Sequence, residues 1–261
     1  MYTKEDIRNV LAGLIFVSII ILPAYSATSV NSCIDINDSG SYTLTKDILD
    51  NTTSPCIKIM ANNVDFDGSG FTIDGIEDAN SVGVQAGTNY TNITVRNLTV
   101  TDWFYGISYN GTSSGVITRI IAISNNIGIN LTSSNNNTLV SNILMSNIDY
   151  GISLSFSSDN IIYNNHFNNT NNFKFDVSNT WNTTKIEGTN ISAGSSLGGN
   201  YWAYPNGTGF SQVCTDMNGD DICDSPYTLN VSNIDYLPLA KIPDLVITQE
   251  NISFLYLLSE V

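Results

Sequence analysis

The sequence predicts an all-β fold, a single-stranded right-handed parallel β-helix of roughly six coils with a disulfide-stabilised C-terminal cap. Three observations lead to this fold. The 261 residues include 35 asparagines and many Ser, Thr and Gly residues, which favour turns over helices, whereas the abundant Ile and Val favour strands. The chain repeats itself about every 23 residues. Leucine does not recur at the offsets of a leucine-rich horseshoe, and no repeat unit contains a helical stretch, so the β-helix remains.

Two sets of short runs mark the repeat. The first set is centred on glycine and comprises Val82-Gly83-Val84, Tyr105-Gly106-Ile107, Ile127-Gly128-Ile129 and Tyr150-Gly151-Ile152. The second set consists of alternating apolar and polar residues and begins at Asn92, Gly115, Asn137 and Asn160. Strands this short cannot bury themselves, so each must stack on the equivalent strand of the next unit.

The alternation predicts which side chains face the interior of the coils. The predicted inward residues are Ile93, Val95, Val116, Leu139, Ile161, Ile107, Ile129 and Ile152. Asn97, Asn142 and Asn165 are predicted to share one turn, where stacked amides bond to each other and to the backbone. We therefore interpret these asparagines as structural ladders and not as ligands.

The N-terminus has the pattern of a signal peptide. Lys4 and Arg8 precede an apolar run from Val10 to Leu22, and small residues follow up to a predicted cleavage site after Ser26. The run of 13 residues is shorter than the roughly 20 that a spanning helix needs, which makes an uncleaved membrane anchor the alternative. The predicted organisation is a signal peptide (1–26), an N-terminal cap (27–55), β-helix repeats (56–197), a C-terminal cap (198–240) and a tail (241–261).

Export makes the four cysteines interpretable, because disulfides persist outside the cytosol. Four cysteines allow three connectivities. Their positions favour Cys33 with Cys56 and Cys214 with Cys223, since about 160 residues separate the two pairs. No Cys-x-x-Cys is present, which argues against a metal-thiolate or redox site.

The net charge limits the classes of partner that the protein can bind. Nine basic and 24 acidic side chains give a net charge of −15, which repels a nucleic-acid backbone and excludes nucleic acid as a partner. The predicted partners are a surface polysaccharide or other cell-envelope proteins, with membrane contact only through the N-terminal segment if it stays uncleaved. The predicted location is secreted or at the cell surface.

Four stretches carry a family resemblance. Residues 61–75 resemble the first coil of the NosD-like, carbohydrate-binding and sugar-hydrolase class of β-helix proteins. Residues 198–202, 216–227 and 235–239 resemble the terminal cap of archaeal surface members of that class. The resemblance implies the β-helix fold and an extracellular location. A role in copper-site maturation belongs to a subset of this family that works with partner genes.

The C-terminal acidic loop is the sharpest candidate site. Its oxygen-bearing residues alternate as in calcium loops, and the predicted ligands are Asp216, Asn218, Asp220, the Ile222 carbonyl and Asp224. The loop departs from an EF-hand because Tyr227 replaces the bidentate Glu and Asp221 stands where Gly is usual. We predict a structural calcium ion here. The alternative is a solvated acidic turn held by the Cys214–Cys223 bond.

Catalytic residues are not assigned. His166 lacks the Gly-His-Gly context of β-helix hydrolases and is interpreted as a turn residue. Asp65, Asp67 and Asp74 cluster at a Gly-rich turn, where the family resemblance implies a structural role. The predicted function is therefore a structural or carbohydrate-binding one without catalysis. The alternatives are a polysaccharide lyase or glycoside hydrolase of the β-helix class, and a NosD-like accessory protein for periplasmic copper-site maturation.

Surface features complete the prediction. Aromatic side chains predicted to offer faces to sugar rings, or to pack within the coils, are Trp103, Tyr105, Tyr109, Tyr150, Tyr163 and Trp181. Predicted glycosylation sites include Asn51, Asn89, Asn110, Asn130, Asn182 and Asn206. Residues 241–248 resemble the first strand of an immunoglobulin-like module, which predicts either a truncated module or a strand that packs on the cap.

Overall fold

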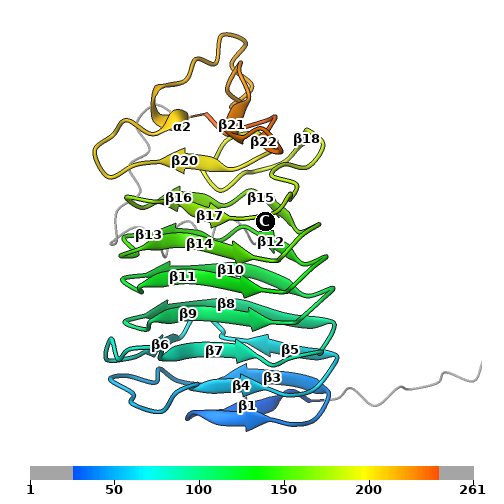
Figure 1. Ribbon diagram of the computed structural model, residues 1–261, viewed down its shortest axis with the longest axis vertical. Helices are drawn as coiled ribbons and strands as arrows, with labels where there is room; N and C mark the ends of the chain where they lie inside the picture. The colour runs from blue at the N-terminus through cyan, green and yellow to red at the C-terminus, as the bar shows by residue number, and fades with distance from the viewer. Residues whose placement is uncertain (1–25, 241–261) are drawn as a thin grey trace, which may run out of the picture.

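Short strands recur in every coil of the solenoid, and equivalent strands of successive coils pair in parallel along its long axis (Figure 1). The computed structural model describes residues 26–240. The predicted signal segment before Ser26 and the predicted tail (241–261) lie outside the described residues. The described chain is a parallel β-helix of about six turns, which confirms the predicted fold class.

Two sheets form the walls of the coils. The strands of the first sheet are β1 (Thr28–Val30), β3 (Gly40–Leu44), β5 (Val64–Asp67), β6 (Thr72–Asp74), β8 (Ile93–Thr101), β10 (Val116–Ile123), β12 (Thr138–Val140), β13 (Ile143–Met145), β15 (Ile161–Tyr163), β16 (His166–Asn168) and β20 (Tyr201–Ala203). Those of the second are β2 (Ile34–Ile36), β4 (Ile57–Ile59), β7 (Val82–Ala86), β9 (Tyr105–Asn110), β11 (Ile127–Thr132), β14 (Tyr150–Ser155) and β17 (Phe173–Phe175). Parallel pairing begins at β1, so residues 27–55, the predicted N-terminal cap, already contain the first coil.

Two small hairpins and one helical turn lie at the C-terminal end, the first hairpin before β20 and the other elements after it. The hairpins pair β18 (Ile186–Glu187) with β19 (Ser196–Leu197), and β21 (Tyr227–Asn230) with β22 (Asn233–Asp235). We call the second of these the cap hairpin. The helical turn is α2 (Phe210–Val213), and no helix in residues 26–240 has the length and apolarity needed to cross a membrane.

Inward-facing residues of successive coils form apolar rows. Ile107, Ile129 and Ile152 pair in register and are fully buried, as are Ile93, Val95 and Leu139. The predictions for Val116 and Ile161 are wrong. Val116 pairs with Thr94 and Ile161 with Thr138, and Ile161 is 43% exposed. A shift of one residue turns a strand residue to the opposite face, so the neighbours Ile117 and Ile162 take the interior positions.

Buried asparagine ladders run along the turns between the strands. In one ladder, the backbone N–H of Asn142 donates to Asn165 Oδ1 at 3.0 Å, and the N–H of Asn165 donates to Asn200 Oδ1 at 3.1 Å. The Asn142 amide also donates to the carbonyl of Ile117 at 2.9 Å. Each amide thus bonds to the coils on both sides. Two further ladders have the members Asn125, Asn147 and Asn169, and Asn137, Asn160 and Asn179.

Asn97 does not belong to the ladder predicted for it. Because Leu98 pairs with Ile120, and Ile121 with Ile143, the residue equivalent to Asn142 is Leu98. Asn97 adopts a positive φ of 51° and its amide donates to Asp67 Oδ1 at 3.1 Å. The repeat unit that contains Asn97 is offset by one residue from the alignment of the repeats made on the sequence. This offset explains the error.

Both predicted disulfides are confirmed. Cys33–Cys56 joins two successive coils at the N-terminal end, and Cys214–Cys223 closes a loop of the cap. No cysteine of the described chain is left free.

Aromatic rings and the cap hairpin close the C-terminal end of the core. Trp202 stacks on Phe167 with ring centroids 4.6 Å apart, and Trp181 packs against Trp202. The cap hairpin then ends two ladders: Asn179 donates its N–H to Asn233 Oδ1 at 2.9 Å, and Asn200 donates its N–H to Asp235 Oδ2 at 2.8 Å. Strand β22 therefore supplies the bonds that a further coil would supply.

A pair of substitutions tests the inward register. Ile129→Asp should destabilise the protein by about 4 kcal/mol or more, because it buries a charge without a partner in a fully apolar row. Asn130→Asp, on the outward side of the same strand, should change the free energy of unfolding by less than about 1 kcal/mol. Thermal melts report both values. Equal shifts for the two variants would refute the register.

Asp235 makes the stability of the cap depend on pH. Burial raises the pKa of Asp235 to about 7, although N–H groups of Asn200, Trp202 and Leu237 favour its charged form. In the unfolded chain an Asp has a pKa of about 4, so between about pH 4 and 7 only the folded chain keeps this proton. The contribution of Asp235 to stability should therefore fall as pH rises through this window.

The measurement compares melting temperatures of the protein and its Asp235→Asn variant from pH 4 to pH 8. The melting temperature of the variant minus that of the parent should increase up to about pH 7 and then level off. The other carboxylates affect both proteins equally, so they cancel in this difference. A difference that stays constant with pH would show that Asp235 is charged in the folded protein throughout.

Candidate functional site

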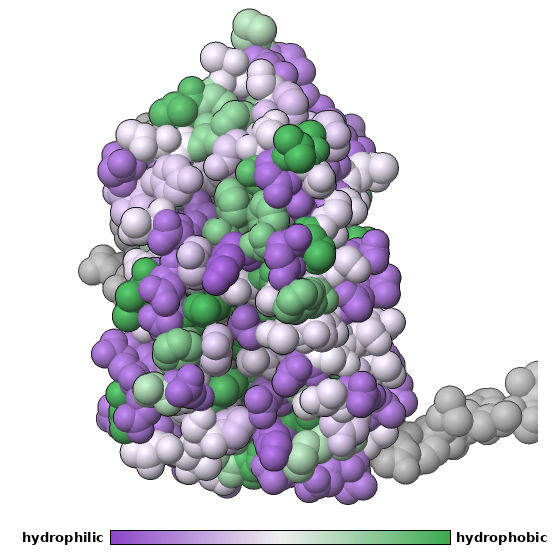
Figure 2. All heavy atoms as spheres, viewed as in Figure 1, coloured by the Kyte–Doolittle hydropathy of each residue, from purple (hydrophilic) through white to green (hydrophobic). Residues whose placement is uncertain are grey.

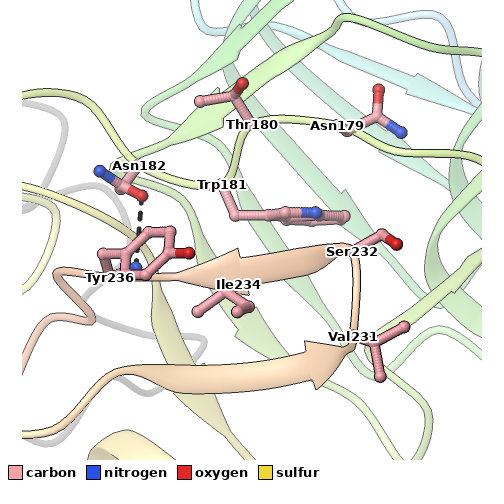
Figure 3. A pocket seen from close by; sticks show the side chains of 8 residues that line it. All are labelled: Asn179, Thr180, Trp181, Asn182, Val231, Ser232, Ile234 and Tyr236. Carbon is pink, nitrogen blue, oxygen red and sulfur yellow. Dashed lines mark hydrogen bonds between the residues drawn. The ribbon is translucent and has the colours of Figure 1, made fainter.

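A pocket of about 330 Å³ opens between the last coil and the cap hairpin (Figure 3). We call it the cap groove. One wall is formed by residues 179–182 of the coil and the other by residues 231–236 of the cap hairpin. Its lining residues are Asn179, Thr180, Trp181, Asn182, Val231, Ser232, Ile234 and Tyr236.

Hydrogen bonds between the two walls hold the cap groove in shape. Asn233 Oδ1 accepts the indole N–H of Trp181 and the backbone N–H of Asn179, each at 2.9 Å. At one end of the groove, Asn182 Oδ1 accepts the backbone N–H of Tyr236 at 3.2 Å (Figure 3). Both walls are thereby fixed to the rigid end of the solenoid, so the groove exists before any ligand binds.

The lining combines apolar surface with uncharged polar groups. Trp181 is fully buried, whereas Tyr236 is 61% and Val231 94% exposed. Thr180 and Ser232 are also exposed, and their hydroxyl groups have no hydrogen-bond partner within the described part of the chain. None of the eight lining residues carries a charge. This arrangement suits a ligand with an apolar face and hydroxyl groups at its edges, as in a sugar ring.

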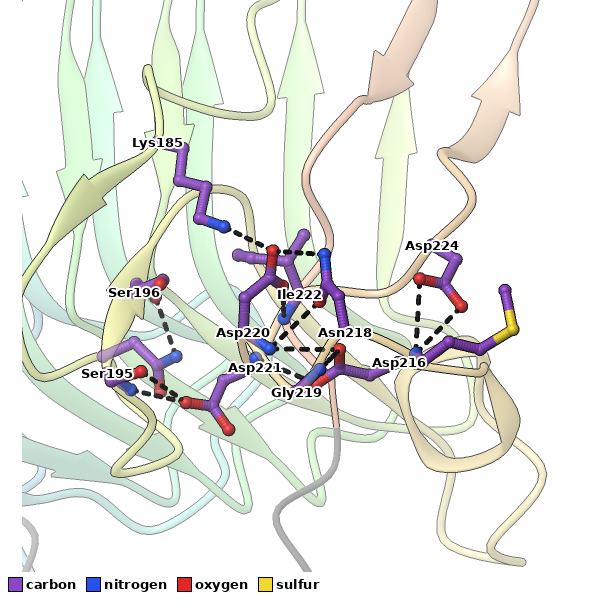
Figure 4. Close-up of polar contacts among 12 residues, drawn as sticks. Lys185, Ser195, Ser196, Asp216, Asn218, Gly219, Asp220, Asp221, Ile222 and Asp224 are labelled. Atoms are coloured by element: carbon purple, nitrogen blue, oxygen red, sulfur yellow. Dashed lines mark hydrogen bonds and ion pairs between the residues drawn. The ribbon is translucent and has the colours of Figure 1, made fainter.

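The acidic loop (216–224) lies elsewhere on the cap, and the structure brings three of its predicted ligands together (Figure 4). Asp216 accepts the backbone N–H groups of Gly219 and Asp221, each at 2.9 Å. The amide of Asn218 donates to Asp220 Oδ2 at 2.9 Å. Asp220 also forms an ion pair with Lys185. Although partial burial opposes it, the hydrogen bond from Lys185 lowers the pKa of Asp220.

The other two predicted ligands have different surroundings. Asp224 accepts the N–H of Met217 at 3.2 Å on the far side of the loop, and Ile222 forms a bridge with Leu239 (Figure 4). Asp221 adopts the left-handed conformation with φ 65°, and its carboxylate accepts the N–H and hydroxyl of Ser195, each at 2.8 Å. Residues 26–240 contain no group of three His, Cys, Asp or Glu side chains arranged for a metal ion. Calcium binding stays a prediction.

The acidic residues of the N-terminal coils form ion pairs with Arg96 or lie close to one another. Arg96 Nε lies 2.9 Å from Asp65 Oδ1, and Arg96 Nη1 lies 2.6 Å from Asp67 Oδ2. Asp74 lies in the adjacent strand β6. Partial burial, followed by the charges of Asp74 and Glu77, raises the pKa of Asp102, which sequence reasoning did not single out. None of these side chains lines the cap groove.

His166 is not a turn residue, contrary to the prediction, because it begins strand β16. Its ring stacks on that of Tyr201 with centroids 4.8 Å apart. The side chain is 4% exposed, and neither ring nitrogen has a hydrogen-bond partner in the described structure. Burial lowers the pKa of His166 to about 4, so the ring is neutral at neutral pH.

The predicted surface residues divide by burial. Among the predicted sequon asparagines, Asn89, Asn110 and Asn206 are exposed, whereas Asn51, Asn130 and Asn182 are half-buried. Among the predicted aromatic residues, Trp103, Tyr109 and Trp181 are buried within the coils and cannot offer a face to a sugar. The exposed Tyr236 of the groove was not among the aromatic residues predicted from the sequence. On the face shown in Figure 2, hydrophobic and hydrophilic residues are interspersed along the solenoid.

One protein family matches the chain. The sequence model of the NosD family, described as periplasmic copper-binding protein (NosD), matches residues 21–207, which is more than half of the chain. No curated protein and no solved structure matches it.

Copper in such a site prefers imidazole, thioether or thiolate ligands, so we compared these donors with the structure. All four cysteines are in disulfides. His166 is the only histidine, and it is enclosed. Met217 is exposed in the acidic loop, Met60 is half-buried, and Met145 is buried in β13. The described residues therefore do not fit an accessible copper site.

The two interpretations of the acidic loop predict different effects of a chelator on the melting temperature. Calcium bound by Asp216, Asn218 and Asp220 relieves the repulsion between carboxylates, so a chelator should lower the melting temperature. Calcium restored at 100 times its dissociation constant should return about 2.7 kcal/mol. Asp220→Asn should lose most of this response. Magnesium should do less, because it demands a tighter octahedral shell.

Asp78→Asn is the matched control, since Asp78 is an exposed carboxylate far along the chain from this loop. It should keep the full calcium response. If the chelator leaves the melting curve of the oxidised protein unchanged, the loop is an acidic turn held by its disulfide, its own hydrogen bonds and Lys185.

Proposed function

This chain belongs to the NosD family, and from that premise we propose that it is an exported cell-surface β-helix protein that binds neutral carbohydrate without cleaving it. The observation that carries the proposal is the cap groove. It combines an exposed tyrosine ring and two aliphatic side chains with the free hydroxyl groups of Thr180 and Ser232. A sugar ring placed on Tyr236 would bury its C–H face and direct its hydroxyl groups to the polar rim.

Charge favours a neutral glycan over an acidic one. The protein carries a net charge of −15, so uronates and sulfated sugars are repelled at long range. No cation in the groove offsets this repulsion, because its lining is uncharged. Lys185, a cation elsewhere on the cap, is paired with Asp220. The proposed ligand is therefore a neutral surface polysaccharide.

A role in binding rather than cleavage is supported by the positions of the acidic and basic side chains. Lyases and hydrolases of β-helix architecture need converging carboxylates, or a metal beside a free Arg or Lys base. Here Arg96 is held between Asp65 and Asp67, and the cap groove contains no carboxylate. The polysaccharide-cleaving alternative lacks an observation that favours it. The copper-maturation alternative has the family name in its support, but the donor residues do not fit it.

The disulfides support the proposed location. Such bonds persist in oxidising compartments, and the two of this protein lie at opposite ends of the solenoid. Together with the predicted signal peptide, they favour a site of action outside the cytoplasm, where a surface polysaccharide is accessible.

Replacement of Tyr236 tests the proposed function. Tyr236→Ala should weaken binding of neutral polysaccharide about tenfold, since loss of one stacking contact is worth about 1 to 1.5 kcal/mol. Affinity electrophoresis through gels containing neutral or uronate polysaccharides gives the dissociation constants. Phe156→Ala is the control, because Phe156 is 72% exposed but does not line the groove.

Two results would contradict the proposal. One is equal retardation of Tyr236→Ala, Phe156→Ala and the parent protein in every neutral polysaccharide. The other is release of reducing ends or unsaturated products by the parent protein, because this would make it an enzyme.

A further inference from the structure

A covered polar site lies outside the cap groove, on the outer surface of the first sheet. Residues 186–195, which we call the strap, comprise β18 and the loop that leads to β19, and they pass over this surface. The described chain has five buried side-chain atoms without a hydrogen-bond partner, and four of them are His166 Nδ1, His166 Nε2, Asn168 Oδ1 and Ser192 Oγ. His166 and Asn168 point outward from strand β16, and Ser192 belongs to the strap.

The strap is packed onto the sheet around His166. In the sheet, His166 stands in register between Ile143 and Tyr201. Ile191 of the strap packs against the clusters that contain both of these neighbours, and its N–H donates to Asn164 Oδ1 at 2.7 Å. The strap therefore covers the row to which the histidine belongs, which explains why the ring is only 4% exposed.

The surroundings of His166 offer no partner for a positive charge. Strand β13 contributes Ile143 and Met145, and strand β20 contributes Tyr201 and Ala203. Tyr201 is the only titratable group on these two strands, and burial raises its pKa to about 12, so it stays neutral.

The charged groups of the strap region are exposed or have partners other than the ring. Glu187 is exposed, and Lys185, next to the strap, pairs with Asp220. At the other end of the strap, Asp221 accepts hydrogen bonds from Ser195. Protonation of His166 under the closed strap would thus create a buried cation with two N–H donors and no carboxylate beside it, which is strongly unfavourable.

We propose that the strap is an acid-released cover, which stays closed while His166 is neutral and opens when the ring gains a proton. Opening hydrates the imidazolium and uncovers the apolar row of Ile121, Ile123, Ile143 and Met145 that Ile191 packs on. The proposal is independent of the cap groove and of the calcium prediction, since neither includes His166.

The pH window follows from the two states of the ring. With the strap open, His166 should titrate near 6.5, the usual value, whereas in the closed state burial lowers its pKa to about 4. The open state therefore binds more protons as pH falls below about 6.5. Each pH unit should raise the opening equilibrium by up to tenfold, and the total rise between pH 6.5 and 4.5 should be about 40-fold.

Hydrogen exchange measured by mass spectrometry tests this directly. Protection of the strap amides, above all that of Ile191, is compared at pH 7, 5.5 and 4.5 after correction for the intrinsic exchange rate. In the parent protein, protection should fall by about 60-fold across this range. His166→Phe keeps a ring to stack on Tyr201 but cannot titrate, so its strap protection should stay within a few-fold.

Both proteins contain the same acidic loop, so titration of its carboxylates affects them equally and cancels in the comparison. Equal loss of strap protection in the parent and the Phe variant would overturn the proposal. His166→Gln serves as a second non-titrating variant if the Phe variant fails to fold. Because the chain has one histidine, its ring resonance is unambiguous in NMR. A pKa near 6.5 in a protein whose strap stays protected would equally overturn it.

Discussion

At the turns of a solenoid, the backbone N–H and C=O groups are buried but no longer paired within a sheet. Each of these groups needs another hydrogen-bond partner. The buried asparagines meet this requirement. Each side-chain amide accepts an N–H of the preceding coil and donates to a backbone carbonyl, as Asn142 does with the N–H of Ile120 and the carbonyl of Ile117. An amide has both functions on one short side chain, whereas an ionised Asp can only accept. The parallel register and the apolar rows depend on these turns being closed.

The same ladders explain how far the sequence predicts the fold. Asn142, Asn165 and the glycine-centred runs recur at a nearly constant spacing, so the second sheet, the inward row through Ile129 and one ladder were predictable. Val116, Ile161 and Asn97 were not, because an assignment of a strand that is wrong by one residue exchanges the inward and outward positions of that strand. Composition cannot reveal such a slip, since Val116 and Ile117 are both good strand residues.

The candidate sites show a different limit. The cap groove unites residues 179–182 with residues 231–236, which are about 50 positions apart and belong to no common motif. Tyr236 looks in the sequence like any other tyrosine, and only the docking of the cap hairpin through Asn233 exposes it beside Trp181. His166 is a similar case. Its place in β16 follows from pairing with Ile143 and Tyr201, and its burial depends on a strap that follows 20 residues later.

The cap hairpin has a consequence for how proteins of this design diverge. Strand β22 presents Asn233 and Asp235 to the last coil in the manner of one more coil. Any coil with asparagines at the ladder positions is therefore an acceptable neighbour for this hairpin. Whole coils can then be gained or lost inside the chain during evolution while the ending stays intact. The length of the solenoid can then vary, while the cap hairpin stays at the tip farthest from the first coil.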